Sequence, residues 1–110
     1  MNNDCIFCAI AKGETDTRLL YEDNSVVVFA DLYPKAPVHL LIVPKHHYAH
    51  LNDVPHQSHL LLGQTMSVAK AMAEEHGVAE SGYRLVMNCG EHGGQEIGHI
   101  HLHLLGGKQL

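Results

Sequence analysis

Three histidines near the C-terminus, His99, His101 and His103, alternate with apolar residues. Successive side chains of a strand alternate between its faces, so the three imidazoles are expected to share one face. Same-face neighbours lie about 6.6 to 7 Å apart, which prevents one metal ion, bound at about 2.0 Å from each nitrogen, from easily collecting all three. Two of them could still share a metal. A central imidazole flanked by two others suits nucleophilic and acid–base chemistry, which makes His101 the candidate nucleophile.

A glycine-rich loop precedes these histidines and contains Gly90, Gly93 and Gly94. Glycines let a backbone approach a phosphate closely, and the backbone amides can then cradle anionic oxygens. Asn88 and Gln95 add neutral side-chain donors at the two ends of the loop. The loop and the alternating histidines together predict chemistry on a phosphate group.

Cys5 and Cys8 lie three residues apart, a spacing that occurs in zinc sites and in redox motifs. A redox motif is expected in a βαβ context, which the pattern of this chain does not provide. Two interpretations therefore stay open: a structural zinc site, or two buried thiols that pack as small hydrophobic groups.

Length and charge restrict the partners. The 110 residues predict a single domain over 1–110, and the net charge of -5 with seven basic residues disfavours nucleic acid as a partner. The N-terminus lacks the pattern of a secretory signal, and no apolar run could cross a bilayer, so no membrane association is expected. Three cysteines, an odd number, argue against a disulfide framework and favour the cytoplasm.

Periodicity predicts an α+β fold with one mostly antiparallel sheet and two helices. The five expected strands span residues 18–22, 25–31, 39–43, 83–88 and 99–105. The first helix is expected over 5–12, capped by Asp4 and ended by Gly13.

The longer helix is expected to begin after a cap at Asn52 or Asp53, with Pro55 in its first turn, and to end at Gly77. Its apolar face is wide for a helix that covers one side of a small sheet. Tight packing and a subunit interface both explain this width.

These motifs resemble the histidine-triad family, whose signature is His-x-His-x-His followed by two apolar residues, here residues 99–105. The likeness covers nearly the whole chain and is strongest to the Hint-type nucleoside phosphoramidase branch. Further matching segments are 5–8, 21–23, 29–31, 36–40, 43–47, 88, 93–95 and 105–107.

The resemblance implies a hydrolase that cleaves purine nucleoside 5′-monophosphate amides or esters, with adenosine as the expected nucleoside. His101 would form a covalent nucleotidyl-histidine, which water hydrolyses to release the monophosphate. A backbone carbonyl would hold its other ring nitrogen. His103 would contact the phosphate and assist proton movement, and His39, opposite the triad strand, would complete the relay. His99, the first histidine of the triad, is also expected among the catalytic residues.

The resemblance also implies substrate contacts, a zinc site and an assembly. Expected substrate contacts are Asn88 and Gln95 at the phosphate, Asp31 at the ribose, Phe29 and Leu32 at the base, and Glu96 near the leaving group. Glu96 is a departure, because eukaryotic phosphoramidases carry a serine there. Expected ligands of a structural zinc are Cys5, Cys8, His47 and His99, with His46 or His50 as substitutes for His47. The family fold, a five-stranded sheet with two helices, implies a homodimer with a ten-stranded sheet.

Two other classes of function compete with this hydrolase. A metal-dependent phosphohydrolase would use His99 and His101 as ligands of a catalytic ion and would lose activity on chelation. A nucleotide-binding or partner-binding module with incidental catalysis would keep its biological role without the imidazole of His101.

Overall fold

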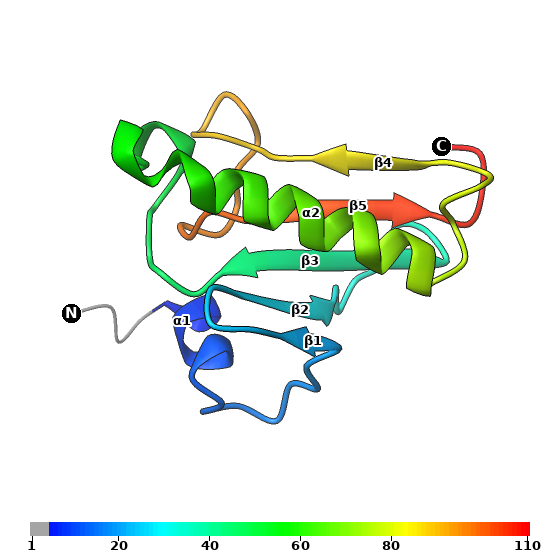
Figure 1. Ribbon diagram of the computed structural model, residues 1–110, viewed down its shortest axis with the longest axis horizontal. Helices are drawn as coiled ribbons and strands as arrows, with labels where there is room; N and C mark the ends of the chain where they lie inside the picture. The colour runs from blue at the N-terminus through cyan, green and yellow to red at the C-terminus, as the bar shows by residue number, and fades with distance from the viewer. Residues whose placement is uncertain (1–4) are drawn as a thin grey trace.

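The computed structural model describes residues 5–110 and contains one five-stranded sheet with two α-helices (Figure 1). The strand order is β1-β2-β3-β5-β4, and all neighbouring strands are antiparallel. This confirms the predicted α+β class. The strands are β1 Tyr21–Glu22, β2 Val26–Ala30, β3 Val38–Pro44, β4 Tyr83–Val86 and β5 Leu102–Gly106, and the helices are α1 Ile6–Ala11 and α2 His59–Glu75.

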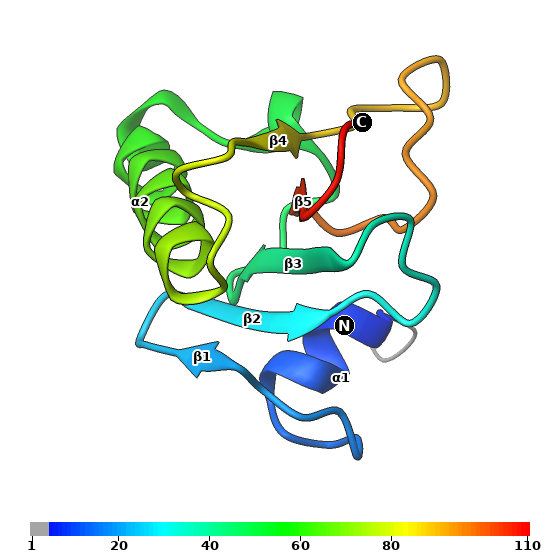
Figure 2. The ribbon, with the colours of Figure 1, turned by 90° about the vertical axis from the view of Figure 1, so that its right-hand side faces the viewer.

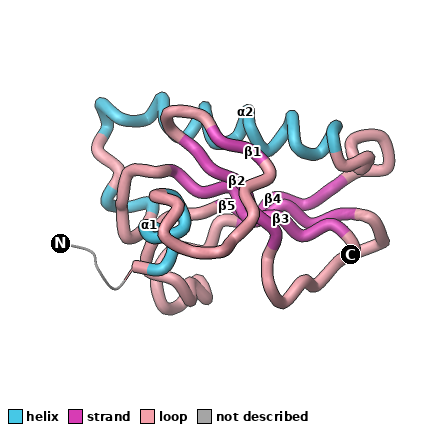
Figure 3. Tube along the Cα trace, turned by 90° about the horizontal axis from the view of Figure 1, so that it is seen from below, coloured by secondary structure: helices cyan, strands magenta, loops and turns pink. Residues whose placement is uncertain are grey.

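The two helices cover opposite faces of the sheet, as Figures 2 and 3 show. Strand β2 is apolar on both faces because both are covered. Val26 and Val28 pack in the cluster beneath α2, and Val27 and Phe29 pack with α1. The same alternation in β5 directs Leu102 and Leu104 to the α2 side. His101 and His103 therefore face the α1 side.

Strand β5 begins later than the histidine pattern predicts. The backbone amide of His99 donates to the carbonyl of Ile97, and that of Ile100 donates to the carbonyl of Tyr48. These bonds tie 99–101 to loops, so pairing with β3 begins at Leu102, opposite Ile42. The predicted strands 18–22 and 83–88 are likewise shorter in the structure.

The start of each helix differs from the prediction. Cys5 is the N-cap of α1, and its sulfur accepts a hydrogen bond from the amide of Cys8, while Asp4 lies outside the described residues. The chain after β3 first forms two 3-10 turns, Leu51–Asp53 and His56–Ser58, so α2 begins after Ser58 and not after Asn52 or Asp53. No helix in the described part of the chain is long and apolar enough to span a membrane.

The end of α2 agrees with the prediction. Gly77 has φ +75°, a conformation that favours glycine, and its amide donates to the carbonyl of Glu74. The sheet covers only part of the wide apolar face of α2: Met72 is 2% exposed, whereas Met66 is 51% exposed.

This difference in burial predicts the stability of two matched variants. Met72→Ala should lower the free energy of unfolding by about 2–5 kcal/mol, because it leaves a cavity between α2 and the sheet. Met66→Ala, the same chemical change on the same helix, should stay within about 0.5 kcal/mol of the wild type. Urea denaturation measures both, and equal losses would contradict the observed packing.

Candidate active site and metal centre

His101 immediately precedes β5 and is 5% exposed. Its Nδ1 lies 2.7 Å from the carbonyl oxygen of His99. A carbonyl only accepts hydrogen bonds, so Nδ1 carries the proton and Nε2 holds the lone pair. The Phe7 ring packs edge-on against the imidazole with 5.1 Å between centroids, and burial lowers the pKa of His101. These contacts keep the imidazole neutral and leave Nε2 available as a nucleophile.

A cavity of about 680 Å³ opens beside His101 on the α1 side of the sheet. His103 and His39 also line it, and the rings of His101 and His103 are 5.0 Å apart. His39 Nε2 lies 3.0 Å from His103 Nδ1 and 3.4 Å from Asp31 Oδ2. Burial lowers the pKa of His39 and lowers that of His103 to about 4, so both imidazoles are neutral near pH 7.

His99 faces a different site from the other two histidines of the triad. It is 0% exposed, and it is not among the residues that line the cavity. Its Nε2 lies 2.7 Å from the carbonyl oxygen of Pro44, so Nε2 carries the proton and Nδ1 holds the lone pair. That Nδ1 lies 3.3 Å from the sulfur of Cys5. The alternation alone suggested that the three imidazoles share one surface. In the structure, His101 and His103 face the cavity, and His99 faces Cys5.

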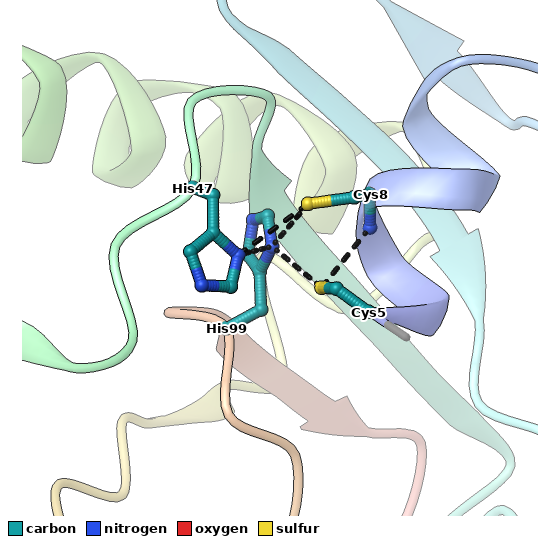
Figure 4. Close-up of side chains that lie close together, drawn as sticks. All are labelled: Cys5, Cys8, His47 and His99. Carbon is teal, nitrogen blue, oxygen red and sulfur yellow. Dashed lines mark hydrogen bonds between the residues drawn. The ribbon is translucent and has the colours of Figure 1, made fainter. Parts of the chain in front are cut away.

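Cys5, Cys8, His47 and His99 form a compact group whose ligand atoms all lie within 4.8 Å of one another (Figure 4). Cys8 Sγ is 3.4 Å from His47 Nδ1 and 3.5 Å from His99 Nδ1, and the two nitrogens are 3.1 Å apart. A tetrahedral zinc with ordinary bond lengths separates its ligand atoms by about 3.3–3.8 Å, so the donor set fits such an ion.

The surroundings of these four residues also suit a closed metal site. The lone pair of His99 Nδ1 already faces the sulfurs. Burial raises the pKa of the Cys8 thiol to about 11, so a bound cation would have to displace its proton. Neither expected substitute for His47 is in the group. The His46 ring packs at a tilt of 42° against Tyr48, and His50 lies 3.9 Å from Asp53.

The glycine-rich loop is held by its own side chains. Asn88 Nδ2 donates to the carbonyl of Gly93, and Gln95 Oε1 accepts from the amide of Gly90. Gln95 Nε2 donates to two further carbonyls, those of Ala49 and Ile97. Asn88 lines the cavity, whereas Gln95 does not. The side-chain amide of Gln95 thus holds the loop in place through both its oxygen and its nitrogen.

The remaining expected substrate residues all line the cavity, namely Phe29, Asp31, Leu32 and Glu96. Leu32 is 86% exposed at the rim. Sequence reasoning missed Phe7 and Ile10, which extend the apolar lining from α1. Phe7 and Ile10 lie three residues apart, as the two cysteines do. This spacing could have indicated that the first helix both lines the cavity and places the cysteines.

The described residues contain a second group with metal-binding composition, formed by Asp31, His39 and His103. Neither this group nor the cysteine group pairs His99 with His101. The lone pair of His99 faces the cysteines, while that of His101 is on the ring nitrogen away from the His99 carbonyl. The arrangement therefore lacks the site that a metal-dependent hydrolase using these two histidines requires.

Comparison with known proteins identifies the family. The family model described as "Scavenger mRNA decapping enzyme C-term binding" matches residues 4–109. The chain is 44% identical to the purine nucleoside phosphoramidase of Escherichia coli K12 over all of its length and 92% of that protein.

Solved structures show the same similarity. A histidine triad protein from Clostridium difficile superposes with a TM-score of 0.97 at 44% identity, covering 100% of this chain and 96% of that one. A HIT family hydrolase from Legionella pneumophila gives a TM-score of 0.93 at 50% identity, covering 96% and 94%. The motifs, the fold and the relatives agree, and the chain belongs to the histidine-triad family.

Proposed function

We propose that this protein hydrolyses purine nucleoside 5′-monophosphate amides or esters through a covalent nucleotidyl-histidine on His101, and that adenosine is the preferred nucleoside. One observation carries the proposal. His101 is buried beside the cavity, and its Nδ1 is bound to the carbonyl of His99, which leaves Nε2 as the nucleophilic nitrogen. The similarity to a purine nucleoside phosphoramidase supports the substrate class.

The reaction would proceed in two displacements at phosphorus. In the first, the Nε2 lone pair of His101 forms a bond to phosphorus, and the bond to the leaving nitrogen or oxygen breaks. The leaving atom keeps that electron pair and takes up a proton from solvent, so that the amine or alcohol is released. The His99 carbonyl stabilises the ring, which becomes positively charged while it still carries the Nδ1 proton. In the second, water attacks phosphorus and releases a proton to solvent, and the P–N bond to His101 breaks. Its electron pair returns to Nε2, and the nucleoside monophosphate is released.

The cavity offers separate surroundings for the parts of such a substrate. The phosphate would lie beside His101, within reach of His103 and Asn88. The ribose hydroxyls would meet the carboxylate of Asp31, whose Oδ1 accepts a hydrogen bond from the amide of Tyr33. The purine would lie against the apolar lining that includes Phe29 and Leu32, since a flat apolar base gains from contact with such side chains.

Replacement of the nucleophile tests this proposal. His101→Ala should reduce AMP release from adenosine 5′-phosphoramidate by at least ~10³-fold, because no other group then forms the covalent intermediate. His92→Ala, which changes an exposed histidine outside the cavity, is the matched control and should retain wild-type activity. Chromatography of the released AMP measures both. A wild type that binds AMP yet releases none would favour the nucleotide-binding module instead.

We further propose that Cys5, Cys8, His47 and His99 hold a structural zinc. Two thiolates and two imidazoles complete a tetrahedral site and leave no open position for a substrate. When bound, the ion would join the start of α1 to two segments, the one that follows β3 and the one that precedes β5. The segment before β5 also contains His101. The zinc would thus stabilise the site without taking part in the reaction.

Metal analysis of protein purified without chelators should find about one zinc per chain. Cys8→Ser should lose the metal and lower the melting temperature, whereas Cys89→Ser, outside the group, should keep it. Brief chelation should leave turnover intact, in contrast to a metal-dependent hydrolase. A wild-type content below about 0.2 zinc per chain would refute the metal site.

We also propose that the protein forms a homodimer whose two sheets join into one of ten strands. Strand β4 is at an edge of the sheet and is the longer of the two edge strands, so its outer backbone groups are available for pairing.

Sedimentation equilibrium distinguishes this assembly from a single copy. At micromolar concentration the measured mass should be about twice the chain mass of 12.1 kDa. A mass that stays at one chain over the whole concentration range would exclude the dimer.

A further inference from the structure

The backbone amide of Lys35 lies 3.1 Å from Nδ1 of His39. A backbone N–H can only donate, so Nδ1 of His39 must accept and cannot carry a proton. A neutral imidazole has one ring proton, which must then be on Nε2. The opposite side of the ring agrees, because Nε2 lies 3.4 Å from Oδ2 of Asp31, a carboxylate oxygen that only accepts. Nε2 also lies 3.0 Å from Nδ1 of His103.

The tautomer of His39 determines that of His103. Because His39 Nε2 carries a proton, it donates across the 3.0 Å contact, and His103 Nδ1 accepts. The ring proton of His103 must therefore be on its own Nε2. His103 lines the same cavity as His101, and the two rings are 5.0 Å apart. A chain of two hydrogen bonds thus connects the amide of Lys35 to a side chain next to the nucleophile.

We propose that the Lys35 amide is a positioning group that fixes the tautomers of His39 and His103, so that His103 presents an Nε2–H donor to the phosphoryl group attacked by His101. This inference rests on the proposed function for the identity of the group that His103 meets. In this arrangement His103 binds a phosphoryl oxygen or the leaving atom through a hydrogen bond, and His39 acts only by orienting His103.

The same geometry prevents His39 from acting in the proton relay that the family resemblance assigns to it. To pass its Nε2 proton to His103, His39 would have to gain another proton at Nδ1. The N–H of Lys35 already points at that nitrogen, so a second proton there would face a donor and leave both without an acceptor. His39 therefore holds its proton and serves as a fixed donor.

The tautomer also decides whether Asp31, His39 and His103 can form a metal site. Their ligand atoms lie within 4.8 Å of one another, as do those of the cysteine group. A metal needs the lone pair of the nitrogen that faces it, but His39 Nε2 carries a proton. His99 shows the opposite arrangement, because the Pro44 carbonyl takes its Nε2 proton and leaves Nδ1 free for a metal. Of these two histidines, His99 therefore presents a lone pair to a possible ion, whereas His39 does not.

Nitrogen-15 NMR of the full chain, labelled at histidine and free of substrate, tests the proposal. At pH 7 both His39 and His103 should carry their proton on Nε2. A scalar coupling between His39 Nε2 and His103 Nδ1 should report the hydrogen bond between them. A proton on Nδ1 of either residue would overturn the proposal. Because no substrate is present, this result is independent of whether the proposed hydrolysis occurs.

Two variants of Lys35 distinguish the effect of its backbone amide from that of its side chain. Lys35→Ala keeps the N–H and should retain both tautomers and the coupling. Lys35→Pro removes the N–H and should give His39 a measurable population protonated on Nδ1, with loss of the coupling. Unchanged tautomers in Lys35→Pro would overturn the proposal, and if this variant does not fold, the wild-type spectrum decides.

A zinc titration followed by the same signals gives a second readout on the wild type. The first equivalent should shift His47 and His99, and a second equivalent should leave the nitrogens of His39 and His103 unchanged. Perturbation of His39 Nε2 by the second equivalent would mean that its lone pair is available, which contradicts the proposed tautomer.

Discussion

Backbone groups decide which ring nitrogen of each histidine carries the proton, and the chemistry of the site depends on that choice. The carbonyl of Pro44 leaves the Nδ1 lone pair of His99 facing the cysteines, and the carbonyl of His99 leaves the Nε2 lone pair of His101 for nucleophilic attack. The amide of Lys35 donates to Nδ1 of His39, so that the ring proton is on Nε2 and this nitrogen is a donor. Identical side chains thus acquire distinct roles without any change of charge.

Burial makes this control possible. The sheet and α1 exclude water from the imidazoles, and the resulting loss of solvation keeps the pKa of His101, His103 and His39 below the ordinary range. A neutral imidazole has one donor and one acceptor nitrogen, so a single backbone contact is enough to orient it. If the rings were exposed and had the ordinary histidine pKa of about 6.5, protonation just below neutral pH would turn both nitrogens into donors and remove the distinction.

Much of the fold and of the site was predictable because it depends on local patterns. The apolar runs of β2 and β3, the end of α2 at Gly77 and the nearness of Cys5 to Cys8 follow from spacing and residue type. The orientation of His99 could not be predicted from the strand pattern, because it depends on contacts with distant residues: the Pro44 carbonyl and the Cys5 sulfur. Only the family resemblance, which gives His99 as a zinc ligand with Cys5 and Cys8, indicated it. The hydrogen bond of the Gln95 amide to the distant carbonyl of Ala49 could not be predicted for the same reason.

The central claim is that His101 Nε2 forms a covalent bond to phosphorus during turnover. Mass spectrometry of protein quenched during the reaction with adenosine 5′-phosphoramidate tests it most directly. The account predicts a nucleotidyl adduct on the peptide that contains His101, labile to acid and stable to alkali as expected for a phosphorus–nitrogen bond. AMP release with no adduct during rapid turnover, or with the adduct on another residue, would contradict it.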